Sequence, residues 1–345
     1  MYKPLGFLLF AWLGVQSCLS AASWEKVPLP ELHEPVNLRV VYAHNPRFRQ
    51  VTKEELTAIL AYARQSAKKE LGITVTFSLL PTIPIETLFT YLKPVVQKAR
   101  QNEIYDFKNG KGERKRLHDA FMQGLKERYT PLKDLIAYAS PYLLSPPKDA
   151  TEESLASALT DTLLQRIKTW QTLKAPDGRP VIDGSVYNEW TYWDALGYGT
   201  LPYDIVITNT LIASVEYYGQ DIHSALRGGV TVGTTTNNNS KLGAYIFWST
   251  FPFMENYPLL TAMRDEDYTE KDALRLCGTY LVHEIGHLLF HYGHPFESDS
   301  CIMTPVPMLK FKVWAEKLDP VKCRQGDYPA MKKGAASIYY NPDWQ

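Results

Sequence analysis

The chain has 345 residues, of which 45% are hydrophobic and 21% charged, and its 37 basic and 37 acidic side chains give a formal net charge of zero. A chain of this length can bury a large core and form one elaborated domain or two. Because there is no excess of positive charge, the composition gives no indication of binding to nucleic acid or to an anionic membrane.

The N-terminus has the pattern of an export signal. Lys3 is followed by an apolar run from Leu5 to Val15 and by the small residues Ser20-Ala21-Ala22, so residues 1–22 are predicted to be a secretory signal peptide. The run is shorter than the roughly 20 residues that span a bilayer, and we expect no transmembrane segment. We predict an exported protein, periplasmic in a bacterium or secreted. Alternatively, Val15-Gln16-Ser17-Cys18 is a lipobox and Cys18 carries a lipid anchor.

The first part of the mature chain alternates strand and helix patterns. Residues 38–42 are predicted to form a strand, and Thr52 with Glu55 forms a capping box for a helix that Gly72 ends. Residues 73–77 alternate as a second strand. A strand, a helix and a strand in this order predict a sheet with a crossover helix.

Helical patterns dominate the next part of the chain, at 84–100, at about 112–128 and at 151–170, where Thr151 marks the start. We interpret residues of about 84–175 as a large helical insertion into a single domain that spans residues 23–345. Residues 176–202 have the composition of a loop. Strands are predicted at 203–208, 230–232 and 244–250, with a polar loop at 234–240, and a helix at about 270–291.

The last helix carries the strongest motif, His283-Glu284-Ile285-Gly286-His287, which has the form H-E-x-x-H. Histidines at positions i and i+4 share one helix face, where they can bind one zinc ion. Glu284 is placed to act as general base towards a zinc-activated water, which is the chemistry of a metalloprotease. The flanking residues are apolar, so the helix is expected to be buried, and its polar side chains need partners there.

A third metal ligand is expected after the helix. His291 would lie about 12 Å along the helix axis from His283, too far to share one ion with it. Gly293 can turn the chain back towards the metal, so His294 is predicted as the third ligand and water as the fourth. His291 is expected to cap the helix or to support a ligand. Two acidic residues remain as alternative ligands, Glu297 and Asp299.

The order of elements and the H-E-x-x-H helix resemble the metzincin clan of zinc peptidases. Cys301-Ile302-Met303 is similar to the Met-turn of that clan, and its C-x-M form is particularly similar to archaemetzincins. The resemblance implies an α+β zincin domain with a mixed twisted sheet, an active-site helix, and Met303 beneath the metal. In the clan pattern H-E-x-x-H-x-x-G-x-x-H, however, Phe290 replaces the glycine and Gly293 the third histidine.

The number and spacing of the cysteines bear on two questions, how many zinc ions the protein binds and whether it forms a disulfide. No second pair of cysteines follows at the spacing that archaemetzincins use for an additional zinc, so one Zn²⁺ is expected. An exported protein can form disulfides. Cys301 and Cys323 lie in the loop-rich C-terminal part and are the expected pair, whereas Cys277 is expected to be a buried thiol of the active helix.

Together these features predict an exported zinc-dependent endopeptidase that acts on a peptide or protein substrate. An extended peptide is expected to add as a further strand beside the strand at Ala244 or the one near Val230. One alternative is a zinc hydrolase for a non-peptide amide, such as a cell-wall crosslink. Another is a catalytically silent zinc-binding or scaffold protein, against which the intact Glu284 argues. The residue that stabilises the oxyanion is left unassigned.

Overall fold

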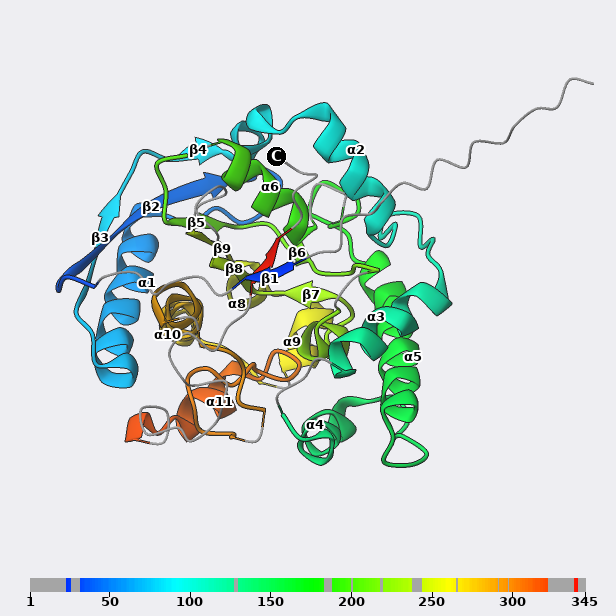
Figure 1. Ribbon diagram of the computed structural model, residues 1–345. Helices are drawn as coiled ribbons and strands as arrows, with labels where there is room; N and C mark the ends of the chain where they lie inside the picture. Colours follow the sequence, from blue (N-terminus) through cyan, green and yellow to red (C-terminus); the bar gives the residue numbers. More distant parts are fainter. Residues whose placement is uncertain are drawn as a thin grey trace, which may run out of the picture.

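The computed structural model describes residues 23–25, 32–126, 130–182, 188–199, 201–217, 220–237, 244–264, 266–290, 292–296, 298–321 and 338–340 (Figure 1). The predicted signal peptide, the lipobox and Cys18 lie outside these residues. Of the helices that are described, none is both long and apolar enough to cross a lipid bilayer.

A mixed sheet forms the centre of the fold, with its strands in the order β3-β2-β5-β9-β8 and with β4 beside β2. Strands β3, β2, β5 and β9 run parallel to one another, and β8 pairs antiparallel with β9 at one edge. Its members are β2 (Val36–His44), β3 (Val75–Leu79), β4 (Ile83–Pro84), β5 (Ile205–Thr208), β8 (Gly233–Asn237) and β9 (Ala244–Ser249). Two small antiparallel pairs join β1 (Ser23–Glu25) to β10 (Ile338–Tyr340) and β6 (Ile212–Ala213) to β7 (Val230–Thr231). An α+β fold with a mixed sheet was predicted, and it is confirmed.

Helices surround this sheet (Figure 1). The α-helices are α1 (Lys53–Ser66), α2 (Pro94–Glu103), α3 (Arg114–Lys126), α4 (Leu132–Ala139), α5 (Glu152–Gln171), α6 (Glu189–Gly199), α7 (Ile222–Leu226), α8 (Phe251–Met254), α9 (Pro258–Arg264), α10 (Glu270–Phe290) and α11 (Phe311–Lys317). Shorter turns of other helix types are η1 (Ala67–Leu71), η2 (Ile85–Tyr91) and η3 (Ser140–Tyr142).

Helix α1 is the predicted crossover between two parallel strands, β2 and β3. The side chain of Thr52 accepts a hydrogen bond from the amide of Glu55 at 3.1 Å, and the Glu55 carboxylate accepts one from the amide of Thr52 at 2.8 Å. Gly72 ends the helical segment with a φ of 74°. The predicted capping box and glycine stop are therefore confirmed.

Helix α10 lies very close to α1 (Figure 1). A side chain at Gly278 would overlap the carbonyl oxygen of Ile59 and lie 2.7 Å from the Cβ of Tyr62. Glycine at this position allows the two backbones to approach each other, and the contact fixes α10 against a helix that is itself joined to the sheet at both ends.

The interpretation of residues 176–202 as a loop is wrong for α6. The side chain of Asn188 caps the start of this helix by accepting a hydrogen bond from the amide of Trp190 at 2.9 Å. Tyr192 then stacks on Phe247 of β9 with ring centroids 3.8 Å apart. The aromatic residues of α6 are poor helix formers. Packing on the sheet therefore stabilises a helix that the local sequence pattern does not indicate.

The interpretation of residues 234–240 as a polar loop is also wrong in part, because β8 extends to Asn237. Thr234, Thr235 and Thr236 have β-branched side chains, which suit a strand. Polar side chains are compatible with this strand, because β8 is at the edge of the sheet and, of the strands that the structure describes, has a neighbour on one side only. The edge strand is therefore more polar than the central ones.

The helical region that was predicted as an insertion lies between β4 and β5 in the chain. Its predicted first helix is broken, since Pro94 disfavours a helical conformation at Lys93 and instead begins α2. Its last helix, α5, begins after Thr151 as predicted. The indole of Trp170 on α5 donates a hydrogen bond to the carbonyl oxygen of Arg227 at 2.6 Å, so this region packs against the segment around α7.

Candidate metal centre

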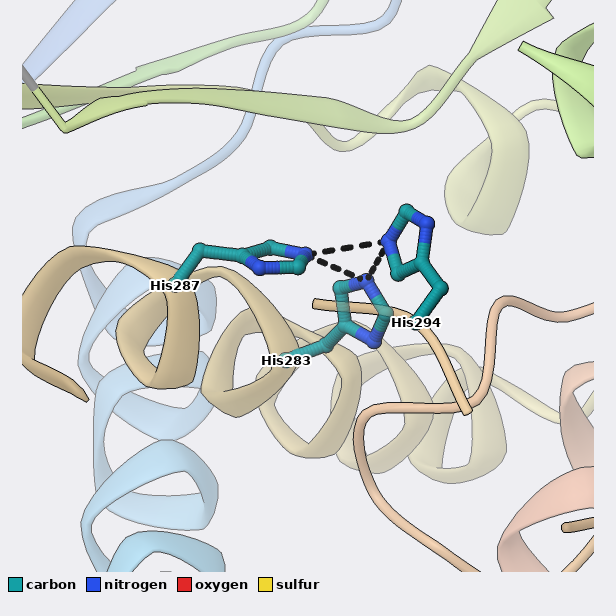
Figure 2. A group of neighbouring side chains, drawn as sticks. All are labelled: His283, His287 and His294. Carbon is teal, nitrogen blue, oxygen red and sulfur yellow. Dashed lines mark hydrogen bonds between the residues drawn. The ribbon is translucent and has the colours of Figure 1, made fainter. Parts of the chain in front are cut away.

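Three histidines converge beside the sheet, and we call them the three-histidine cluster: His283 and His287 on α10, and His294 from the segment that follows it (Figure 2). Their Nε2 atoms are separated by 3.0 Å between His283 and His287, 3.1 Å between His287 and His294, and 3.2 Å between His283 and His294. These three side chains are close enough to bind one metal ion.

The hydrogen bonds on the outer side of two rings determine where their protons lie. Nδ1 of His283 faces the carbonyl oxygen of Ile302 at 2.9 Å, and Nδ1 of His287 faces that of Tyr292. A carbonyl oxygen only accepts, so each Nδ1 carries the proton and each neutral ring leaves an unprotonated Nε2. Two of the converging nitrogens therefore present lone pairs to each other, an arrangement that a cation would stabilise.

The spacing of the cluster fits a small metal ion. Imidazole nitrogens bound to tetrahedral zinc at about 2.0–2.1 Å lie about 3.3–3.4 Å from one another. Burial lowers the pKa of His287 to about 4, and burial together with the neighbouring histidines lowers the pKa of His283 and of His294 well below the usual range. All three rings are thus neutral near pH 7, the form that binds metal.

Glu284 follows His283 on α10, and its carboxyl group faces the edge strand β8. Its Oε2 accepts a hydrogen bond from the hydroxyl of Thr235 at 2.5 Å. A side chain at Gly233 would lie 3.0 Å from Oε1 and would overlap the indole of Trp248. Burial raises the pKa of Glu284 to about 7, although the hydrogen bond from Thr235 acts in the opposite direction. The carboxyl group is therefore poised to exchange a proton near neutral pH.

The turn around Met303, which follows the histidines in the chain, packs against α10. The carbonyl of Ile302 holds His283, and the buried sulfur of Met303 fills the space above Gly286, where any side chain would overlap it. Gly286 stands one residue before His287, so Met303 packs on α10 next to this histidine. Its role as a Met-turn residue stays a prediction.

The remaining candidates named from the sequence lie elsewhere or outside the described residues. Asp299 is exposed and pairs with Lys317 at 3.2 Å, apart from the cluster. His291 and Glu297 lie outside the residues that the structure describes. Cys277 is free and buried as expected, and Cys301 is disulfide-bonded. Since Cys323 is also outside the described residues, its pairing with Cys301 stays a prediction.

The short helix α7 brings two residues to the site that sequence reasoning missed. The ring of His223 is 7% exposed and meets the ring of His294 at a centroid distance of 4.9 Å and an angle of 86°. Arg227 is 1% exposed, and its guanidinium donates to the carbonyl oxygen of Val306. Helix α7 has only five residues, too few to show a helical pattern in the sequence. Nothing in the local sequence therefore indicates that His223 and Arg227 are buried at the site.

Two further buried carboxyl groups, Glu189 and Glu216, lie near Glu284, and we call them the carboxyl pair. They are 7% and 4% exposed, and the hydroxyl of Ser214 donates to Glu189 at 2.9 Å. Burial, followed by the charge of Asp221, raises the pKa of Glu189 to about 8, and burial raises that of Glu216 well above its usual range. The pair therefore retains protons at neutral pH.

Comparisons of the chain with protein-family models, with curated proteins and with solved structures find no match. Any functional conclusion therefore depends on the residues of the site itself.

Proposed function

We propose that this protein is an exported zinc-dependent endopeptidase of the metzincin type. The observation that carries the proposal is the convergence of three imidazole nitrogens, together with the buried carboxylate of Glu284 next to His283 on α10. Three neutral imidazoles with an open fourth position are a typical donor set of catalytic zinc. When bound, zinc would act as a Lewis acid on the substrate carbonyl and would acidify a water molecule to a pKa of about 7.

Glu284 supplies the proton transfers of this reaction. Its carboxyl group is held at one oxygen by Thr235, and its pKa of about 7 suits both acceptance and donation of a proton. We assign it as general base towards the attacking water and then as general acid towards the leaving amine. A protein that only bound zinc would have no need of a buried carboxylate adjacent to a ligand.

The edge strand β8 favours an extended peptide as the substrate over another amide. In the described part of the sheet, β8 pairs with β9 alone, and Thr235 in its middle contacts Glu284. An unpaired strand edge can bind a peptide through main-chain hydrogen bonds. A peptide bound there would pass next to the three-histidine cluster, as hydrolysis requires.

The substitution Glu284→Gln tests the proposal. It should retain zinc and the fold but reduce hydrolysis of a peptide library by about 10²–10⁴-fold, since general acid–base catalysis typically contributes this much. The exposed Glu54 on α1 offers a matched control, Glu54→Gln, which should cleave at the parent rate. Chelation should stop the parent enzyme. Equal rates for Glu284→Gln and the parent protein would refute the proposed function.

Export is tested separately at the N-terminus of the mature protein. Mass spectrometry should find a chain that starts near residue 23. A lipid on Cys18 would support the alternative of an anchored lipoprotein, and retention of Met1 would contradict export.

A further inference from the structure

His223 has a buried nitrogen atom that the protein does not satisfy. Among the described residues, its Nδ1 has no hydrogen-bond partner and is closed off from solvent. The whole side chain is 7% exposed. Buried polar atoms in folded proteins are almost always hydrogen-bonded, and an unpaired one costs free energy, so this atom requires an explanation.

The position of His223 connects this atom with the metal centre. The ring stands perpendicular to the ring of His294, with centroids 4.9 Å apart, so it borders the three-histidine cluster without being part of it. It comes from α7, whereas Glu284 and two of the histidines come from α10. A group bound at the cluster would thus have α10 on one side and α7 close by.

The charge near His223 favours an oxygen atom as the missing partner. A neutral histidine ring carries one N–H and can hold it on Nδ1, where it is a hydrogen-bond donor. Arg227 is itself buried and makes the potential around this ring positive. The carbonyl oxygen of an amide gains negative charge during hydrolysis, and donors in a preorganised, buried position stabilise it.

We infer that His223 contacts the substrate, donating a hydrogen bond from Nδ1 to the carbonyl oxygen of the scissile bond at the three-histidine cluster. This inference rests on the proposed function, and it fills the role of the oxyanion stabiliser that no residue of the H-E-x-x-H helix supplies. The helical region between β4 and β5 has an indirect part, because Trp170 on α5 holds the backbone of Arg227 at the end of α7.

Three substitutions separate this role from packing. His223→Leu removes both nitrogens but keeps much of the volume, His223→Asn retains a polar atom near the position of Nδ1, and His223→Gln retains one nearer to Nε2. We expect kcat/KM to fall about 10²–10³-fold in His223→Leu, as for the loss of one oxyanion donor. His223→Asn should recover at least tenfold over His223→Leu, and His223→Gln should not. His118→Leu on α3, far from the cluster in the chain, is the matched control and should have the parent activity.

Zinc affinity and inhibitor binding give readouts that do not depend on turnover. Zinc should bind His223→Leu as tightly as the parent protein. A phosphinic peptide, which offers a second oxygen beside the metal, should bind the zinc-loaded His223→Leu variant at least tenfold more weakly than the parent protein. A mercapto-peptide, which binds metal through sulfur and offers no such oxygen, should bind both proteins equally.

The outcomes separate this inference from the proposed function. If the parent protein binds zinc and the phosphinic peptide but cleaves no peptide, the proposed function is wrong while inhibitor binding still decides the role of His223. Equal weakening of both inhibitors, weaker zinc binding in His223→Leu, or parent activity in that variant would each overturn the inference. A parent protein that binds no zinc would overturn both.

Discussion

The three-histidine cluster and the carboxyl pair are both buried polar groups near Glu284, but their protons lie in different places. In the cluster, backbone carbonyls fix the outer protons of His283 and His287, so the inner nitrogens converge without protons. In the carboxyl pair, burial raises the pKa of both groups, so that protons remain bound. Burial thus leaves protons on the carboxyl groups, whereas two of the neutral imidazoles turn unprotonated nitrogens towards each other, an arrangement that a cation would stabilise.

This difference indicates what each group contributes. Removing one histidine should impair metal binding far more than folding, because the protein already tolerates the neutral rings. Changing the carboxyl pair should alter the pH dependence of stability, because its protonation differs between the folded and unfolded states. The two groups can therefore be tested independently.

The largest effect is expected for His294→Ala, which removes one of three metal ligands. Zinc affinity, measured by competition with a chromogenic chelator, should fall by more than about 100-fold. Loss of a residue that only hydrogen-bonds to a metal ligand reduces metal affinity by up to about 100-fold, and loss of the ligand itself should have a larger effect. His291→Ala should weaken binding only modestly. The reverse order would show that the chain after α10 holds the metal through His291 and that the assignment of His294 is wrong.

A smaller effect is expected for Gly233→Ala on β8, which disturbs Glu284 without removing it. The added methyl group would overlap Trp248 and lie 3.0 Å from the Glu284 carboxylate, so β8 or the carboxylate must move. Peptide cleavage should fall about 10–100-fold, since small misplacements of a catalytic group have effects of this size, while zinc affinity stays unchanged. Gly124→Ala on α3, where the nearest atom is 3.8 Å away, is the control. Parent activity in Gly233→Ala would show that β8 does not position Glu284.

The smallest effect concerns the carboxyl pair. The pKa of Glu189 is about 8 in the folded protein and near 4.5 when unfolded, so between these values the folded state binds the extra proton and stability falls as pH rises. Glu189→Gln cannot lose a proton, and it should reduce the loss of unfolding free energy between pH 5 and pH 8 by on the order of 1 kcal/mol. Denaturant unfolding at both pH values measures this. Identical pH dependence in the parent and Glu189→Gln proteins would mean that Glu189 is not buried with a proton.

Local sequence predicted the parts of the fold and site in which neighbours along the chain interact. The capping box of Thr52, the helix through His283 and His287, and the return of His294 after Gly293 all depend on residues a few positions apart.

The parts that sequence missed depend on distant contacts. Helix α6 is stabilised by stacking of Tyr192 on Phe247, and β8 by its pairing with β9, although its threonines suggested a loop. His223 reaches the cluster because α7 packs beside α5, which is far from it in the chain. No spacing rule connects His223 with His294, so only the folded chain brings them together.

X-ray absorption at the zinc edge of the zinc-loaded protein, joined to metal analysis, tests the metal centre most directly. We predict one zinc per chain with three imidazole nitrogens at about 2.0–2.1 Å and one further light ligand. Failure to retain zinc, or a sulfur ligand at about 2.3 Å, would contradict a centre built from His283, His287 and His294.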